Sequence, residues 1–226
     1  MANLIAIVGN SGSGKSTSFR TLNPKETFII NIASKPLPFK GWRSNYTTWD
    51  KENPSGNFVN TSSVEMIGKI LQYINSKRTE IKNVIIDDSQ YIMSFEAMDR
   101  AKEKGFEKFT DIAQKFYSIL KTGVLMRDDL NVIVSCHAEN VGTADEPQLK
   151  IKTIGKMIDN VITVEGLFTY VLFTEIAKDD ENKVRYSFIT HSDGTNTAKT
   201  PFGCFDEDRI PNDMQLVLDA INEFNN

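Results

Sequence analysis

The chain has 226 residues, of which 40% are hydrophobic and 25% charged, and its formal net charge is −4 at pH 7. This composition predicts one globular α/β domain over residues 1–226 with a substantial core. It excludes a protein that attracts nucleic acid through its overall charge, so any such binding would need a local basic surface.

The cysteines and the apolar runs indicate the compartment. Cys136 and Cys204 have no metal-ligand spacing around them, and we expect both to be reduced. The first predicted strand starts almost at the N-terminus, which leaves no room for a signal peptide, and no apolar stretch approaches the length of a membrane span. We therefore expect a cytoplasmic protein that does not enter a membrane.

The first predicted element is a buried strand over residues 4–8, which runs directly into a glycine-rich loop. The loop fits the pattern G-x-x-x-x-G-K-[ST], and residues 15–22 can then begin a helix. Strand, loop and helix in this order predict a Walker A motif rather than a chance glycine-rich turn. The predicted binding residues are Gly9, Asn10, Ser11, Gly12, Ser13, Gly14, Lys15 and Ser16, with Thr17 as a weaker candidate.

A Walker A loop binds phosphate largely through its backbone. Its glycines let the chain turn tightly and point successive N–H groups inward, and the helix N-terminus adds a partial positive charge. Lys15 would reach the β- and γ-phosphates, and the Ser16 hydroxyl would ligate Mg²⁺. The sequence therefore predicts ATP and Mg²⁺ as cofactors.

The second predicted strand, residues 27–32, leads into a loop over residues 33–41 that contains two prolines. In an open α/β sheet, the edge where this loop starts is the edge that binds ligands. We expect a short strand over residues 45–49 in the segment that follows. Its tryptophans could stack on nucleic-acid bases, but we favour Trp42 and Trp49 as core or interface anchors, because large aromatics usually bury most of their area.

A helix over residues 62–78, opened by a capping box, precedes a second motif. Residues 82–86 form a buried strand of β-branched residues that ends in two carboxylates, which is a Walker B pattern. Asp87 would hold Mg²⁺ through a water. Asp88 points to the other face if the strand geometry continues, and it could orient or deprotonate the attacking water; the alternative is that it caps the next helix.

Helices are predicted from residue 90, with a mixed charge run near residues 99–105, and over residues 106–126. The strand over residues 130–137 ends at the same edge as the two motifs. Ser135 or His137 could therefore sense a γ-phosphate through a hydrogen bond, while a structural hydrogen bond is the alternative for the histidine.

The last third of the chain mixes loops and strands. Residues 138–160 break the regular pattern and include three lysines that could contact DNA phosphates or only solubilise the surface. Residues 158–164 are rich in β-formers, and residues 167–176 and 184–190 predict a hairpin. A glycine and proline loop carrying Lys199 follows, and a helix over residues 212–224 closes the chain.

Together these features resemble the compact RecA-like ATPases of bacteriophages, and among them the single-strand annealing ATPases. The resemblance is carried by the two Walker motifs, the loop over residues 35–39, the strand that ends Ser135-Cys136-His137, and the hairpin followed by Lys199. It covers nearly the whole chain in element order. It implies a RecA-like P-loop NTPase fold, in which helices flank a mostly parallel central sheet and an antiparallel hairpin lies near the C-terminus.

The resemblance also implies partners. ATP would lie between neighbouring subunits of a ring or filament in the host cytoplasm. Single-stranded DNA would bind loops matching residues 99–105 and 138–160, and a phage single-strand-binding protein is a further expected partner. Lys199 matches the basic finger that reaches the ATP of the adjacent subunit, where a cation stabilises the transferring phosphoryl group; a solvated loop lysine is the alternative. The expected catalytic residues are thus Lys15, Asp88, His137 and Lys199.

One departure from the family pattern concerns hydrolysis. RecA-like enzymes commonly carry a catalytic glutamate after the second strand, whereas this chain has Asn31-Ile32-Ala33-Ser34-Lys35 there. Either Asp88 takes that role, or hydrolysis is slow and ATP mainly controls assembly.

The leading hypothesis is therefore a Mg²⁺-dependent ATPase that binds single-stranded DNA as an oligomer in phage recombination or annealing. A P-loop nucleotide or small-molecule kinase is one alternative, but the chain has seven arginines and none between residues 128 and 184, where a phosphate-clamping lid would need them. An ATP-dependent assembly module that never contacts DNA is the other.

Overall fold

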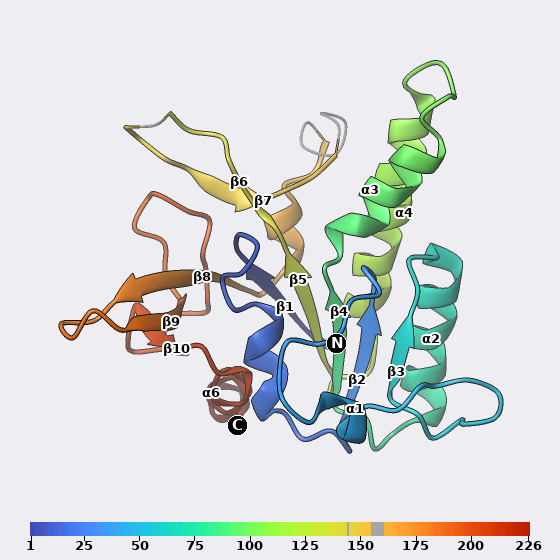
Figure 1. Ribbon diagram of the computed structural model, residues 1–226, viewed down its shortest axis with the longest axis horizontal. Coiled ribbons are helices and arrows are strands. Elements are labelled where there is room, and N and C mark those ends of the chain that lie inside the picture. Colours follow the sequence, from blue (N-terminus) through green and yellow to red (C-terminus); the bar gives the residue numbers. More distant parts are fainter. Residues whose placement is uncertain (144, 155–160) are drawn as a thin grey trace.

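The fold is an α/β arrangement around one mostly parallel sheet (Figure 1). The computed structural model describes residues 1–143, 145–154 and 161–226. Within these residues, eight strands form the sheet in the order β10-β9-β8-β1-β5-β4-β2-β3, and β6 and β7 form a small second sheet. The strands are β1 Asn3–Val8, β2 Thr27–Asn31, β3 Phe58–Asn60, β4 Asn83–Asp87, β5 Asn131–Cys136, β6 Ala138–Asn140, β7 Leu149–Ile151, β8 Tyr170–Lys178, β9 Val184–Ile189 and β10 Arg209–Pro211.

The strands of the central sheet differ in direction and burial. Neighbours from β3 to β8 pair in parallel, whereas β8, β9 and β10 pair antiparallel. Every residue of β2, β4 and β5 is buried, which explains why these strands appear in the sequence as continuous apolar runs. The outer part of the β8–β9 hairpin is exposed. The predicted hairpin near the C-terminus is thus confirmed.

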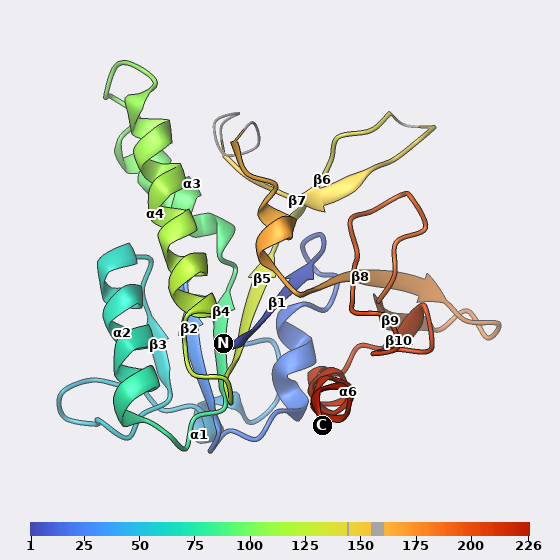
Figure 2. The same ribbon diagram turned by 180° about the vertical axis from the view of Figure 1, so that it is seen from behind.

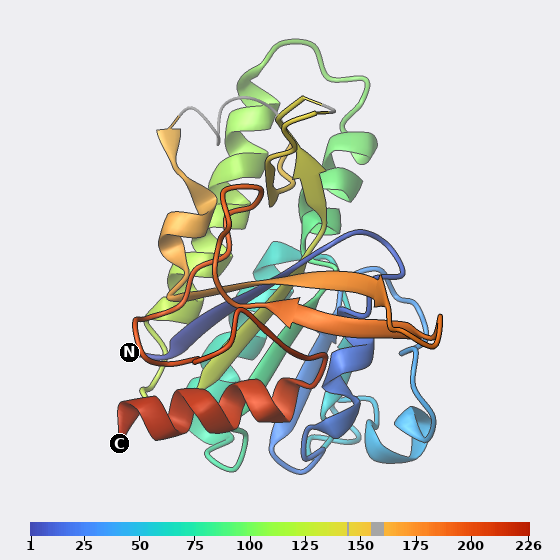
Figure 3. The same ribbon diagram turned by 90° about the vertical axis from the view of Figure 1, so that its left-hand side faces the viewer.

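Helices cover both faces of the sheet (Figures 1 and 2). The helices α2, α3 and α4 lie on one face, and α6 packs against the short helix η1 on the other. Figure 3 shows α6 in front of the sheet and α4 behind it. The helices are η1 Ser16–Thr21, α1 Trp42–Asn45, α2 Val64–Lys77, α3 Gln90–Asp99, α4 Glu107–Val124, η2 Val164–Leu167 and α6 Met214–Asn225.

Strand β1 shows how the sequence builds two core layers. Its side chains alternate between the two faces, as strand geometry requires. Leu4 and Ala6 join the core under α2 and α4, while Ile5 and Ile7 join the core under η1 and α6. All four are buried, so β1 is fixed in the centre of the molecule.

The strand register brings several strand ends to one edge. Val8 at the end of β1 is paired with Cys136 at the end of β5, and Asn31 at the end of β2 is paired with Asp87 at the end of β4. The segments that follow these strands therefore start side by side. This edge carries the candidate functional site.

Two expectations about local structure, a strand over residues 45–49 and a capping box at the start of α2, were wrong. Residues 45–49 do not form a strand: α1 ends at Asn45, and Thr48 makes only an isolated bridge to Phe58. The helix expected after the glycine-rich loop is present as a short 3₁₀ helix, η1. The capping box also differs, because Ser63 caps α2 by accepting from the Met66 N–H, while Glu65 pairs with Lys69 one turn along.

The irregular segment over residues 138–160 contains more order than its sequence indicates. Its described part includes the antiparallel pair β6–β7, in which Ala138 faces Ile151. Of the β-former-rich stretch over residues 158–164, residues 158–160 lie outside the described residues, and Val164 begins η2. Lys156 also lies outside them.

The tryptophans act as anchors rather than as exposed stacking platforms. Trp49 packs against Phe28 and Tyr73, with ring centroids 6.1 and 5.6 Å apart, and Trp42 packs against Phe58 at 5.6 Å. Both side chains are partly buried against the core. The favoured interpretation of the two residues is therefore confirmed.

Two further expectations concern the state of the cysteines and the absence of a membrane span. Cys136 and Cys204 are free and buried, and burial raises the pKa of Cys136 to about 12, so its thiol is a poor nucleophile. Among the helices that the structure describes, none combines the length and apolar character needed to cross a membrane.

Candidate functional site

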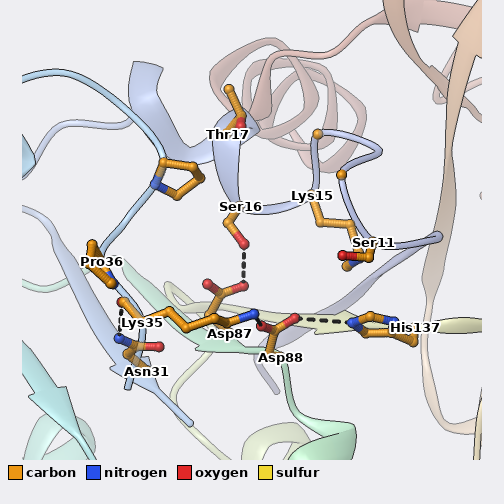
Figure 4. Close-up of a pocket in the computed structure, with 13 residues that line it drawn as sticks. Ser11, Lys15, Ser16, Thr17, Asn31, Lys35, Pro36, Asp87, Asp88 and His137 are labelled. Carbon is orange, nitrogen blue, oxygen red and sulfur yellow. Dashed lines mark hydrogen bonds and ion pairs between the residues drawn. The ribbon is translucent and has the colours of Figure 1, made fainter. Parts of the chain in front are cut away.

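A cleft of about 230 Å³ opens at the C-terminal edge of the parallel strands (Figure 4). We call it the edge cleft. It brings together side chains from three predicted segments: the loop after β1, the acids at the end of β4, and the histidine after β5. Its lining residues are Ser11, Gly12, Gly14, Lys15, Ser16, Thr17, Asn31, Lys35, Pro36, Pro38, Asp87, Asp88 and His137.

Residues 9–16, here called the glycine loop, depend on their glycines. A Cβ on Gly9 would lie 1.8 Å from Oγ1 of Thr174 and 2.6 Å from Oγ of Ser13, which leaves no room for a side chain. Gly12 and Gly14 have φ angles of 78° and 95°, in the left-handed region that other residues rarely adopt. The loop conformation therefore favours glycine at these three positions.

Strand β8 supports the loop through a residue that the sequence did not single out. The Ser13 hydroxyl donates to the Asn10 carbonyl at 2.7 Å and lies 2.6 Å from the Thr174 hydroxyl, which is 3.3 Å from the Val8 carbonyl oxygen. Thr174 thus joins the loop to the strand beside it. A lone threonine in a β-rich run carries no pattern that would reveal this contact.

Lys15 lies folded along its own loop. Its ammonium group donates to the carbonyl oxygens of Gly9 and Asn10, both at 2.9 Å, and the residue is buried. Burial lowers the pKa of Lys15, although the nearby charges of Asp88 and Asp87 oppose that shift. The loop therefore holds a buried cation between its backbone and two carboxylates.

Asp87 is the most deeply buried acid of the cleft. Its Oδ1 accepts from the Ser16 hydroxyl at 2.9 Å and from the Ser135 hydroxyl at 2.6 Å. Burial raises the pKa of Asp87 despite these bonds. Ser135 in turn accepts from the Asp88 N–H at 2.7 Å. Ser135 therefore lies at the predicted edge, and it also holds both aspartates in position through hydrogen bonds.

Asp88 leaves the strand geometry, which corrects one expectation. Strand β4 ends at Asp87, and Asp88 has a φ angle of 58°, so its side chain does not turn to the opposite face and both acids line the edge cleft. Asp88 is not a helix cap either: Ser89 holds that position of α3 and makes no side-chain capping bond. A left-handed conformation at a non-glycine residue is strained and is often found at functional sites.

Two basic side chains flank the Asp88 carboxylate (Figure 4). Lys35 Nζ lies 2.6 Å from Oδ2, and His137 Nε2 lies 3.5 Å from Oδ1. Burial alone would raise the pKa of Asp88, but the bonds from His137 and Lys35 outweigh burial and lower it to about 2. Asp88 is therefore ionised at neutral pH and is fully engaged.

Lys35 is a site residue that the sequence placed near the edge without a role. It follows β2, where Ser34 has a φ angle of 54° and the Asn31 side-chain amide donates to the Lys35 carbonyl at 2.7 Å. Its side chain is 60% exposed, but its tip reaches Asp88 and lies 5.7 Å from the centre of the Tyr91 ring. Hydrogen bonding to Asp88 raises the pKa of Lys35.

Lys199 does not belong to the edge cleft of its own chain. Its N–H and carbonyl pair with Val171, which is itself paired with Ala6 in the middle of β1. It thus lies beside the middle of the sheet rather than at its C-terminal edge, and its side chain is exposed. The role expected for Lys199 concerns a neighbouring subunit, which a single chain does not contain.

Two arms project beyond the edge that carries the cleft (Figures 1 and 2). One is the α3–α4 hairpin with the charge run at its tip, and the other is the β6–β7 hairpin. Arg100 near the first tip pairs with Glu96, Glu103 and Asp111, so this charge run is partly neutralised. Lys150 on β7 lies 3.3 Å from Glu139.

The donor set of the cleft limits what it could hold. Within the described residues, no group of three or more His, Cys, Asp or Glu side chains could form a metal centre. Ser16 and Asp87 nevertheless present neighbouring oxygen donors, which suit a hard cation that keeps water or phosphate oxygens as its other ligands. The cleft could thus combine one such cation with an anion beside Lys15.

The sequence matches neither a known protein-family model nor any curated protein. What the edge cleft binds must therefore be inferred from the residues that line it.

Proposed function

We propose that the protein is a RecA-like P-loop ATPase that binds ATP with Mg²⁺ in the edge cleft. One observation carries this proposal: a glycine loop with Lys15 and Ser16 lies opposite Asp87 and Asp88 across one cleft, at the ligand-binding edge of a parallel sheet. Phosphate oxygens would replace the carbonyls of Gly9 and Asn10 as partners of Lys15.

The pair Ser16 and Asp87 fits a magnesium ion. Both are hard oxygen donors, and their hydroxyl and carboxylate oxygens lie 2.9 Å apart. A Mg²⁺ ion held there would neutralise negative charge on the phosphates. The Ser135 hydroxyl holds the Asp87 carboxylate in position from the other side, which fixes the orientation of the carboxylate.

Asp88 is the acid best placed to orient the attacking water. In the free protein its carboxylate is occupied by Lys35 and His137. A γ-phosphate near Lys15 would attract the exposed Lys35 side chain, because that side chain can swing on its flexible stem. Asp88 would then be free to accept a hydrogen bond from water, while Lys35 would stabilise the phosphate charge.

The wider proposal is an oligomer that binds single-stranded DNA during phage recombination or annealing. It is supported by the resemblance of the motif order and by the two arms, which extend from the same edge as the cleft. Lys199 in this proposal acts on the nucleotide of the adjacent subunit.

A second candidate function is an ATP-dependent assembly module with slow hydrolysis and no DNA contact. One observation favours it: no carboxylate follows β2, where Asn31 hydrogen-bonds the loop and Lys35 occupies Asp88. A low pKa also makes Asp88 a weak base.

The deciding experiment is steady-state ATP hydrolysis with and without single-stranded DNA, using Lys15→Ala as the blank. Lys25→Ala, which removes an exposed lysine outside the cleft, is the matched control. We expect hydrolysis that depends on Lys15, is indifferent to Lys25 and rises with DNA. Hydrolysis that depends on Lys15 but does not change with DNA would favour the assembly module. Hydrolysis in Lys15→Ala as fast as in the wild type would overturn the ATPase proposal.

A further inference from the structure

A second hollow, of about 410 Å³, adjoins the edge cleft on the side away from Asp87. We call it the side pocket. Gly12, Gly14 and Thr17 line both spaces, so the glycine loop separates them. The other walls come from η1, β9 and the segment that leads into α6. The residues that matter for its chemistry are Arg20, Tyr186 and Asn212.

Asn212 presents a buried amide with an unused donor. The residue is 5% exposed, and its Nδ2 has no hydrogen-bond partner among the described residues. Its backbone is fully engaged, since its N–H donates to the Tyr186 carbonyl at 3.2 Å and its carbonyl accepts from Arg20 at 2.9 Å. Buried polar side chains are nearly always hydrogen-bonded, so this amide has donor capacity that a bound molecule could use.

The Asn212 amide lies against the glycine loop. A Cβ built on Gly14 would be 3.2 Å from both Nδ2 and Oδ1 of Asn212, and 3.2 Å from the Tyr186 ring. The two side chains therefore border the loop directly. A ligand that contacts them is also in reach of the loop.

Tyr186 supplies a flat surface at the same place. It lies on β9, near the edge of the sheet, and is 46% exposed although its ring touches the glycine loop. Such a ring can stack on a planar heterocycle. Arg20 is held by the carbonyls of Thr17 and Asn212, so its guanidinium is fixed beside the pocket.

We propose that the side pocket binds the purine base of the nucleotide whose phosphates occupy the edge cleft. Tyr186 stacks on the base, and the Asn212 amide donates to a ring acceptor of the purine. The inference rests on the proposed ATP site, and it adds the part of the molecule that recognises the base. The phosphate end is fixed at Ser16 and Asp87, so the nucleoside leaves the loop past Thr17 and Gly14, where the side pocket begins.

The test compares the affinities of ATP and inorganic tripolyphosphate, each with Mg²⁺, by calorimetry. Tripolyphosphate reports the edge cleft alone, because it has no base. We expect Tyr186→Ala and Asn212→Ala each to weaken ATP about tenfold, as loss of one stacking or hydrogen-bond contact does. Tripolyphosphate binding is expected to change less than about twofold, because neither variant alters a phosphate ligand.

Two controls separate binding from folding. Phe202→Ala removes a fully exposed aromatic that lines neither space, and it should change neither affinity. Asn212→Ala should leave the melting temperature of the nucleotide-free protein unchanged or raise it, because the amide it removes has no partner there. A structural role of Asn212 would instead lower it.

The outcomes are distinct. Equal loss of ATP and tripolyphosphate in Tyr186→Ala, or an unchanged ATP affinity in both pocket variants, overturns the base pocket while the phosphate site stands. Lys15→Ala that leaves tripolyphosphate affinity intact overturns the proposed function itself. Wild-type protein should also bind ATP more tightly than CTP, and Tyr186→Ala should reduce that preference.

Discussion

At the scale of single residues, the two aspartates at the end of β4 have pKa values shifted in opposite directions although they are adjacent. Burial raises the pKa of Asp87, whereas bonds from His137 and Lys35 lower the pKa of Asp88 to about 2 against burial. The difference arises because the Asp87 carboxylate accepts hydrogen bonds from two hydroxyl groups, whereas the Asp88 carboxylate lies against two basic side chains. One acid is therefore poised for a cation, and the other is already neutralised by the protein.

Replacing Asp88 by asparagine tests the water-orienting role. Asp88→Asn should lower kcat for ATP by about 100-fold, because the attacking water loses the carboxylate that orients it, with little change in nucleotide affinity. Asp99→Asn, at the exposed end of α3, is the matched control. Steady-state kinetics and nucleotide titration make the comparison, and an unchanged turnover would remove Asp88 from the mechanism.

Asp88 should also affect how the free energy of unfolding depends on pH in the acid range. The pKa of folded Asp88, about 2, lies below the unfolded value of about 3.9, so its contribution to the free energy of unfolding is fully present above that value and is lost as the pH falls toward 2. Wild type should exceed Asp88→Asn in stability at pH 6, and the gap should close between about pH 4 and pH 2. Denaturant unfolding across that range measures it; a gap that stays constant contradicts the assigned shift.

Asp87 should behave in the opposite way. A raised carboxyl pKa means that the folded protein loses stability as pH rises through the unfolded value, because the buried group resists ionisation. Asp87→Asn should therefore raise the melting temperature of the nucleotide-free protein at neutral pH while it removes Mg²⁺-dependent hydrolysis. A fall in both quantities would indicate that the carboxylate stabilises the fold.

At the scale of elements, the glycine loop depends on strand β8, which lies about 160 residues further along the chain. Gly9→Ala should destabilise the protein by about 1–3 kcal/mol, because its Cβ would overlap the Thr174 hydroxyl. Gly68→Ala on α2 is the control, since a Cβ there meets no atom within 4 Å, and it should stabilise by up to about 1 kcal/mol. Adding Thr174→Ala to Gly9→Ala should recover part of the lost free energy of unfolding, as measured by chemical denaturation. Additive effects of the two substitutions would argue against a steric overlap between the new Cβ and Thr174.

Elements with a strong pattern were predictable from the sequence, and those set by distant contacts were not. The runs that became β1, β4 and β5 are apolar because they are buried on both faces, and parallel pairing places the ends of all three at one edge. The turn of Asp88 into the cleft depends on its φ angle and on Lys35, which comes from a different loop. Tyr186 and Asn212 likewise become candidate site residues only because they lie against Gly14, and no local sequence pattern encodes that position.

At the scale of the whole molecule, the charge distribution decides where a polyanion could bind. The net charge is −4, so single-stranded DNA would have to contact local basic side chains at the arms. Lys102 and Lys104 are exposed at the tip of the α3–α4 arm, next to Phe106, which is 86% exposed. An exposed ring beside cations is a combination that suits unpaired bases and their phosphates.

Charge reversal at this tip tests the proposed DNA contact. Lys102→Glu with Lys104→Glu should weaken single-stranded DNA binding in ATP and low salt, and should reduce the slope of log affinity against log salt by about 1.4 if both lysines touch phosphates. Lys25→Glu with Lys51→Glu makes the same change in net charge at exposed positions away from the arms. Fluorescence anisotropy of a labelled oligonucleotide gives both the affinity and its salt dependence. Equal losses of DNA affinity in the two double variants would show that only the net charge of the protein matters, which would contradict a contact at the tip.

The root of the α3–α4 arm lies two residues after Asp88, and this has a mechanical consequence. Gln90, the first residue of α3, accepts from the His137 N–H, so the arm is attached to the same strand end that holds the Asp88 carboxylate. A helix of ten residues is about 15 Å long, so a tilt of about 10° at its root moves its far end by about 3 Å. The arm is thus rooted beside the cleft, and a rearrangement around the Asp88 carboxylate that tilted α3 would be enlarged at the outer surface.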